Sequence, residues 1–182
     1  MLFRSGVAIH GGLESATHRD WEWVLGVNLW GVIHGVEAFV PRMMAQQQPA
    51  HIVNTASMAG LIASKGLGVY NTSKYAVVGL SETLQKDLLP YNIGVSVLCP
   101  MGVTTNIGTS ERSRPADLKN PGGLPQTDGI ELIGRYLTPE HVAARVLRAV
   151  KANRLYVITH EEGREPLRRR FQRMDTAFEE SA

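Results

Sequence analysis

Residues 51–100, HIVNTASMAGLIASKGLGVYNTSKYAVVGLSETLQKDLLPYNIGVSVLCP, contain the pattern that decides the fold. The stretch opens with a short apolar strand, residues 51–57, and closes with a second buried strand, residues 93–100. Between them, from Tyr70, valine and leucine recur at helical spacing until Pro90 ends the helix. Strand, loop, helix and strand in this order favour a parallel α/β sheet with right-handed crossovers.

Tyr70 and Lys74 lie one turn apart on this predicted helix, so their side chains share one face. A lysine ammonium there stabilises a tyrosinate, and we expect it to lower the pKa of the Tyr70 phenol from about 10. Such a phenol exchanges a proton with an alcohol near neutral pH. Ser57, thirteen residues upstream, could hold the same substrate oxygen. A Tyr-x-x-x-Lys pair is common by chance, and it gains specificity here from the strand that ends at the serine.

At these residues the sequence resembles the short-chain dehydrogenases/reductases, over about residues 5–160. Ser57, Tyr70 and Lys74 match the family's catalytic residues in type and spacing, and Asn28 matches its catalytic asparagine. The resemblance implies a Rossmann-type, doubly wound parallel sheet and hydride transfer between NAD or NADP and the carbon of a carbonyl or secondary alcohol. It implies that Tyr70 is the acid/base and that Ser57 positions the reacting oxygen. It also implies that Lys74 tunes Tyr70 and binds the cofactor ribose, and that Asn28 holds a water molecule of the proton relay.

The same resemblance implies a set of cofactor-binding residues at the ends of the strands. Val103 and Thr105 match the positions that hold the nicotinamide carboxamide. Met101 departs from the family, in which a glycine usually follows the proline. The residue that distinguishes NAD from NADP belongs to a strand that the sequence lacks, so both cofactors stay open. The implied cofactor-binding residues are Gly6, Thr55, Tyr70, Lys74, Pro100, Val103 and Thr105.

The amino-terminal part of the family pattern has no counterpart in this sequence. The glycine-rich turn that brings the backbone to the pyrophosphate is missing, and residues 2–7 match only the remnant of the family's fourth strand. We interpret the chain as an N-terminally truncated Rossmann domain, and favour a misassigned start or a fragment over a natural short form. Residues 1–182 alone are expected to bind NAD(P) poorly, and the open sheet edge invites pairing with another chain.

Three further segments complete the predicted single domain. A long helix over residues 18–47, capped by Thr17, is apolar on two faces, one for the sheet and one for a partner subunit. Residues 104–137 are rich in turn formers and long for a connection, which is typical of a lid or a disordered segment, and the resemblance implies that they form the substrate loop. Its Arg112 and Arg114 could meet an anionic substrate or simply be solvated. Residues 161–182 form a charged tail with amphipathic content, which suggests a helix laid on the surface or on a partner. The substrate loop's apolar wall is expected from Leu118, Leu124, Ile130, Leu132 and Ile133.

Composition limits the classes of function. Charged residues make up 20% of the chain and the net charge is +2, which gives no reason to expect a nucleic-acid partner. The one cysteine, Cys99, excludes a disulfide framework and is expected to be a small buried residue. No run of eighteen apolar residues predicts a membrane span, so we expect a cytoplasmic protein. The six histidines are scattered without metal-ligand spacing, and Ser57 lacks the G-x-S-x-G context of a serine hydrolase.

The sequence therefore predicts an NAD(P)-dependent oxidoreductase that acts on a small alcohol or ketone. By the resemblance, we expect a homodimer or homotetramer. The alternative is a non-catalytic fragment of the same family that serves as an oligomerisation or interaction module through its apolar helices.

Overall fold

The computed structural model describes residues 2–3, 6–122 and 134–179. Within this part of the chain, four strands form one sheet in the order β1-β2-β3-β4, and every neighbouring pair is parallel. This confirms the parallel sheet predicted from residues 51–100. The strands are β1 (Leu2–Phe3), β2 (Ala50–Thr55), β3 (Ile93–Cys99) and β4 (Tyr156–Ile158).

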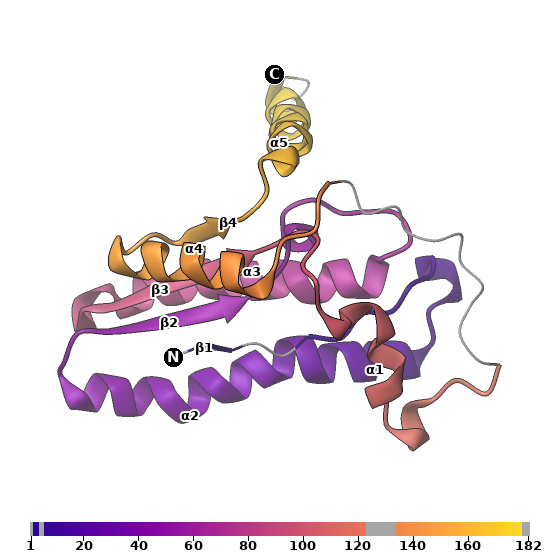
Figure 1. Ribbon diagram of the computed structural model, residues 1–182, viewed down its shortest axis with the longest axis horizontal. Helices are drawn as coiled ribbons and strands as arrows, with labels where there is room; N and C mark the ends of the chain where they lie inside the picture. Colours follow the sequence, from indigo (N-terminus) through magenta and orange to yellow (C-terminus); the bar gives the residue numbers. More distant parts are fainter. Residues whose placement is uncertain (1, 4–5, 123–133, 180–182) are drawn as a thin grey trace.

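Helices cover both faces of the sheet, as in a doubly wound fold (Figure 1). Helices α2 (Gly31–Gln46) and α3 (Gly68–Leu88) pack on one face, and α4 (Pro139–Lys151) packs on the other. Successive residues of β3 serve the two faces in turn, since Val95 joins the α2 and α3 side and Leu98 joins the α4 side. Burial on both faces explains why this strand is apolar almost throughout.

The helical run before β2 has three parts rather than the single regular helix predicted. Helix α1 (His18–Leu25) passes through a π-helical segment (Gly26–Trp30) into α2. Thr17 is the N-cap as predicted, and it forms a reciprocal capping box with Asp20. On α2, Val32 and Gly35 are buried while Phe39 is 37% exposed, so the described residues cover the second apolar face only in part.

By length and composition, the run His18–Gln46 is the one helix of the described residues that could cross a membrane, with a mean hydropathy of 1.4. This differs from the expectation drawn from apolar run length alone. The criterion is weak, because core helices of globular proteins also meet it. Here the helix packs through Val32 and Val36 into the clusters that cover the sheet.

Short 3-10 segments connect these elements. They are η1 (Leu13–Ser15), η3 (Met58–Gly60), η4 (Leu89–Tyr91), η5 (Asn106–Ser113), η6 (Ala116–Leu118) and η7 (Glu161–Gly163). Segment η3 packs closely on α3 because Gly60 has no side chain. A Cβ at Gly60 would lie 2.5 Å from the carbonyl oxygen of Lys74, which only glycine tolerates.

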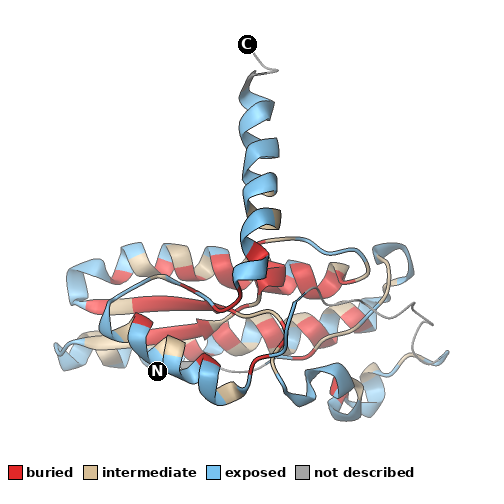
Figure 2. Cartoon of the chain, turned by 45° about the horizontal axis from the view of Figure 1, so that its top comes forward, coloured by how far each residue is buried: buried red, intermediate tan, exposed pale blue. Residues whose placement is uncertain are grey.

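The predicted C-terminal helix is present as α5 (Arg164–Glu179), but it does not lie on the surface of the domain. Figures 1 and 2 show α5 projecting away from the body, exposed along most of its length. Only its first turns touch the core, where Leu167 packs against a buried cluster and the Arg170 guanidinium lies 5.4 Å from the Tyr75 ring centre. Phe171 and Phe178 are 54% and 78% exposed.

Within the predicted substrate loop, η6 packs against α1, while η5 residues such as Ile107 and Arg112 line a cavity at the carboxyl ends of the strands. Leu118 packs with the cluster that holds Trp23, so its assignment to the substrate wall is wrong. The other predicted wall residues, Leu124, Ile130, Leu132 and Ile133, lie outside the described residues.

Arg114 is neither solvated nor available to a substrate. Its buried guanidinium lies 2.8 Å from the Asp20 carboxylate and 5.0 Å from the Trp23 ring centre. Burial acts to raise the pKa of Asp20, but hydrogen bonds from Thr17, Arg114 and Asn120 outweigh it and leave that pKa below its ordinary value. This ion pair fastens the segment after β3 to the start of α1.

Candidate active site

A cavity of about 1950 Å³ opens at the carboxyl ends of β2 and β3. This is the edge at which parallel α/β sheets bind their ligands. Part of α4 also faces the cavity, and its Leu147 is 55% exposed there. All the predicted site residues except Asn28 line this cavity: Gly6, Thr55, Ser57, Tyr70, Lys74, Pro100, Val103 and Thr105.

Ser57 and Tyr70 meet inside the cavity. Ser57 is the N-cap of η3, where its Oγ accepts a hydrogen bond from the Ala59 N–H at 3.1 Å and donates to the Pro100 carbonyl at 3.3 Å. Burial raises the pKa of the Tyr70 phenol, and its hydrogen bond with Ser57 offsets only part of that rise. The predicted lowering of this pKa by Lys74 is therefore wrong for the chain alone, because desolvation dominates.

Lys74 lies beneath Tyr70 and is only 1% exposed. Its Nζ lies 5.5 Å from the Tyr70 ring centre and donates a hydrogen bond to the Thr55 carbonyl oxygen at 3.2 Å. Burial lowers the pKa of this ammonium to about 8, although the nearby Cys99 acts in the opposite direction. Cys99 itself is a buried core residue as predicted, and burial raises the pKa of its thiol to about 12.

The buried lysine is expected to cost the fold stability. Its pKa in the folded chain lies below its unfolded value of 10.5, so the cost is complete below about pH 8 and disappears above about pH 10.5. Replacing Lys74 with methionine should stabilise the chain by about 3 kcal/mol at pH 7, less the loss of one hydrogen bond, and by almost nothing at pH 10.5. Urea unfolding at the two pH values measures this difference.

The matched control for that prediction is Lys86→Met on the exposed side of the same helix. This change should alter stability by no more than about 0.5 kcal/mol at either pH. Equal effects of Lys74→Met at pH 7 and pH 10.5 would contradict the assignment of a charge cost to Lys74.

Asn28 sits behind the cavity in the π-helical segment, and it is fully buried. Its amide exchanges two hydrogen bonds with the Val7 main chain, at 2.8 and 2.9 Å, and donates a third to the Ser73 hydroxyl at 3.0 Å. Ser73 precedes Lys74, and Val7 follows Gly6. Asn28 therefore fixes two walls of the site relative to each other, and these bonds leave its side chain no free donor for a relay water. Segments of π-helix are frequent at functional sites.

The residues present fit the nicotinamide end of a dinucleotide. The Thr55 Oγ1 is buried and has no hydrogen-bond partner within the described residues. The site therefore contains a polar atom that a bound cofactor could satisfy by a hydrogen bond. Gly6 leaves space beside the lysine, since a Cβ there would lie 3.6 Å from Nζ. Thr105 caps η5 through Ile107, and Val103 pairs with Leu137, so this wall is fixed by backbone contacts.

Comparison with known proteins decides the family. The family model for short chain dehydrogenases matches residues 3–116. The chain belongs to the short-chain dehydrogenase family. It is 38% identical, over 92% of its length, to a C alpha-dehydrogenase of Sphingobium sp.. A short-chain dehydrogenase/reductase from Burkholderia phymatum, solved in complex with NAD, is 38% identical and superposes with a TM-score of 0.84 over 94% of this chain. The family and the sheet together confirm the predicted Rossmann-type fold.

The chain spans only part of these relatives. It covers 56% of the Sphingobium protein, 64% of the Burkholderia chain, and 60% of a CLA biosynthesis dehydrogenase/reductase from Lactiplantibacillus plantarum to which it is 31% identical. The activities named for these proteins belong to whole chains.

The sequence pattern did not identify two serines whose hydrogen bonds connect the walls of the site. Ser110, on η5, is buried and its hydroxyl accepts a hydrogen bond from the Ala8 N–H at 3.1 Å, across more than one hundred residues. Ser73 was not singled out either, although it links Asn28 to the Tyr70 carbonyl. A lone serine in a turn-rich or helical segment carries no periodic signal. Among the described residues, no three His, Cys, Asp or Glu side chains are grouped to hold a metal ion.

Proposed function

We propose that this chain carries the catalytic centre of an NAD(P)-dependent dehydrogenase or reductase that interconverts a secondary alcohol and a ketone. One observation carries the proposal: Ser57, Tyr70 and Lys74 converge in one cavity, with Tyr70 hydrogen-bonded to Ser57 and Lys74 directly below the phenol ring. This is a proton donor, a hydrogen-bonding group for the same oxygen, and a cation, at one place.

A nicotinamide cofactor supplies or accepts the hydride in such a reaction. Thr55, Lys74, Val103 and Thr105 would hold its nicotinamide and ribose, and Gly6 leaves the backbone close to it. Ser57 binds the substrate oxygen and orients the carbonyl carbon. Tyr70 transfers a proton between its phenol oxygen and that substrate oxygen.

The electrostatics of the chain alone determine which form of Tyr70 is present at neutral pH. The raised pKa keeps the Tyr70 phenol protonated at neutral pH, and a protonated phenol is the form that donates to a ketone oxygen. Lys74, with a pKa of about 8, is mostly charged at pH 7 and stabilises the phenolate left behind. Asn28 contributes by holding Val7 and α3 in position.

The test is a steady-state assay of the protein against ketones, with NADH and with NADPH at concentrations high enough to offset the weak cofactor binding expected of residues 1–182, followed at 340 nm. We expect one of the two reduced cofactors to be consumed only when the ketone is present. The Ser57→Ala variant should lose this consumption. A stable, self-associating protein with no turnover of either cofactor would contradict the proposal and support the interaction module instead.

A further inference from the structure

A buried histidine just after β4 takes no part in the proposed reaction. His160 is only 2% exposed, and both nitrogens of its ring have polar neighbours. Nδ1 lies 3.3 Å from the Met101 amide nitrogen and 2.7 Å from the Thr159 hydroxyl oxygen. Nε2 lies 3.1 Å from the Arg135 carbonyl oxygen. The ring therefore joins three segments of the chain: the one that follows β3, the one that precedes α4, and the end of β4.

The chemistry of these neighbours determines where the ring carries its hydrogen. A main-chain N–H can only donate, and a carbonyl oxygen can only accept. Nδ1 therefore accepts from the Met101 N–H, and Nε2 carries the hydrogen that it donates to the Arg135 carbonyl. The Thr159 hydroxyl rotates and donates to Nδ1 as well. Only the neutral ring with its hydrogen on Nε2 satisfies all three neighbours.

The two segments that the imidazole joins also pair with each other. The Leu137 N–H donates to the Gly102 carbonyl at 3.0 Å, and the Thr104 N–H donates to the Leu137 carbonyl at 3.0 Å. A Cβ at Gly102 would lie 3.3 Å from the Arg135 carbonyl oxygen, so the two main chains approach closely. Val103, which the proposed function assigns to the nicotinamide, lies in the middle of this pairing. The place of its main chain therefore depends on where the two segments begin.

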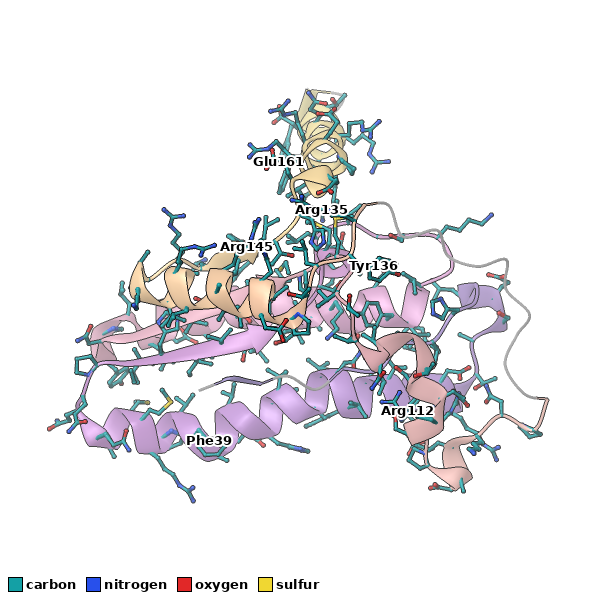
Figure 3. The ribbon with its side chains drawn as sticks, viewed as in Figure 1. Phe39, Arg112, Arg135, Tyr136, Arg145 and Glu161 are labelled. Carbon is teal, nitrogen blue, oxygen red and sulfur yellow. The ribbon has the colours of Figure 1, made fainter. Side chains whose placement is uncertain are left out.

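The outer contact of the segment before α4 is weaker than the contact with the imidazole. Figure 3 shows Arg135 beneath the root of α5, where its guanidinium reaches Glu162 at 3.7 Å. Both of these side chains are partly exposed, and exposed ion pairs contribute only about 0–1 kcal/mol. The buried ring of His160 is therefore the contact that fixes this segment against the chain after Pro100.

We propose that His160 is a positioning residue, whose neutral ring holds the main chain of residues 101–103 in the place where it borders the nicotinamide. The inference rests on the proposed function, because that function places the nicotinamide at Val103. Nδ1 carries the role, since it is the acceptor for the Met101 N–H. Without an acceptor at this place, the Met101 N–H loses its partner and the wall that begins there is no longer fixed.

The first measurement is NMR spectroscopy of the protein labelled with 15N, without cofactor. We expect the Nδ1 signal of His160 at the shift of a ring nitrogen without hydrogen, and the Nε2 signal at the shift of a protonated one. A scalar coupling between Nδ1 and the Met101 amide nitrogen should be detectable across the hydrogen bond. The His160→Leu variant assigns the ring signals. A hydrogen on Nδ1 would overturn the inference.

The second measurement is a titration of three variants with NADH at up to millimolar concentration, followed by the amide signals of Gly102 and Val103. His160→Asn keeps an acceptor at the place of Nδ1, whereas His160→Gln keeps only a group near the place of Nε2, and His160→Leu keeps neither. The asparagine variant should bind NADH within about threefold of the parent protein, and the other two about tenfold or more weakly, because the Met101 N–H lacks an acceptor. A residue that merely fills space would show the opposite order, since glutamine is closer to histidine in volume.

His141→Gln, at an exposed position in the first turn of α4, is the matched control and should leave NADH affinity unchanged. A glutamine variant that binds as well as the asparagine variant would overturn the inference. So would a parent protein whose Gly102 and Val103 signals ignore NADH, because the wall would then not border the nicotinamide.

These outcomes are separate from that of the proposed function, since the titration needs no turnover. A protein that shows the expected ring hydrogen and order of affinities but reduces no ketone removes the function and leaves the role of His160. A protein that reduces ketones and binds NADH equally well in all three variants removes only that role.

Discussion

Replacing Tyr70 with phenylalanine should reduce ketone reduction by about 10²–10⁴-fold, the usual contribution of a positioned general acid. The phenol is the only group hydrogen-bonded to Ser57 that can supply a proton to a substrate oxygen in the described part of the cavity. Phenylalanine retains the ring and its packing with Ala59 and Leu67. The loss should therefore appear in kcat, with little change in the KM of the ketone, in the assay at 340 nm.

Tyr75→Phe is the matched control, because Tyr75 lies on the same helix and contacts Arg170 of α5 instead of the cavity. Its activity should stay within about twofold of the parent protein. A Tyr70→Phe variant as active as the parent would show that the proton comes from another group, and the proposed mechanism would fail with it.

The sheet and its helices could be predicted from sequence because their signals are local. Residues 51–57 and 93–100 are apolar runs bounded by turn formers, and they became β2 and β3 within two residues at either end. Thr138 caps α4 and Pro139 is its first residue, a start signal that depends only on adjacent residues. The π-helical segment could not be predicted, since it accompanies a contact between residues that are distant in sequence, the hydrogen bond between buried Asn28 and Val7.

The positions of the site residues were predictable, but their electrostatics were not. Spacing places Tyr70 and Lys74 on one face, and both side chains line the same cavity. The pKa of Tyr70 depends on how completely the phenol is desolvated, which is a property of the folded chain and of no sequence motif. Arg114 illustrates the same limit, because an arginine in a turn-rich segment has no local sign that its partner is Asp20.

That ion pair joins the segment after β3 to the start of α1. Asp20 accepts hydrogen bonds from Thr17 and Asn120 and forms an ion pair with Arg114, so one carboxylate caps α1 and also binds both sides of η6. Arg114 is 4% exposed and packs on Trp23, so removing the carboxylate leaves a guanidinium in a site with little access to water. A buried ion pair is costly to break from one side even when its net contribution is small.

Asp20→Ala should therefore destabilise the chain by about 3–5 kcal/mol in urea unfolding at pH 7. Glu22→Ala, an exposed carboxylate on the same helix, should change stability by no more than about 0.5 kcal/mol. The depressed pKa of Asp20 gives the pH dependence: its contribution is complete above about pH 4 and is lost as pH falls through the folded value.

The double variant Asp20→Ala with Arg114→Leu decides whether the cost comes from the orphaned charge. It should be more stable than Asp20→Ala alone, because it also removes the buried guanidinium, whose remaining ion pair is the 3.6 Å contact with Glu111. A double variant less stable than the single one would show that Arg114 stabilises the domain through Trp23 and the Leu118 carbonyl, independently of Asp20. The two outcomes distinguish an ion pair that positions η5 and η6 from simple packing of Arg114. Only the ion pair makes the position of these segments depend on the carboxylate that caps α1.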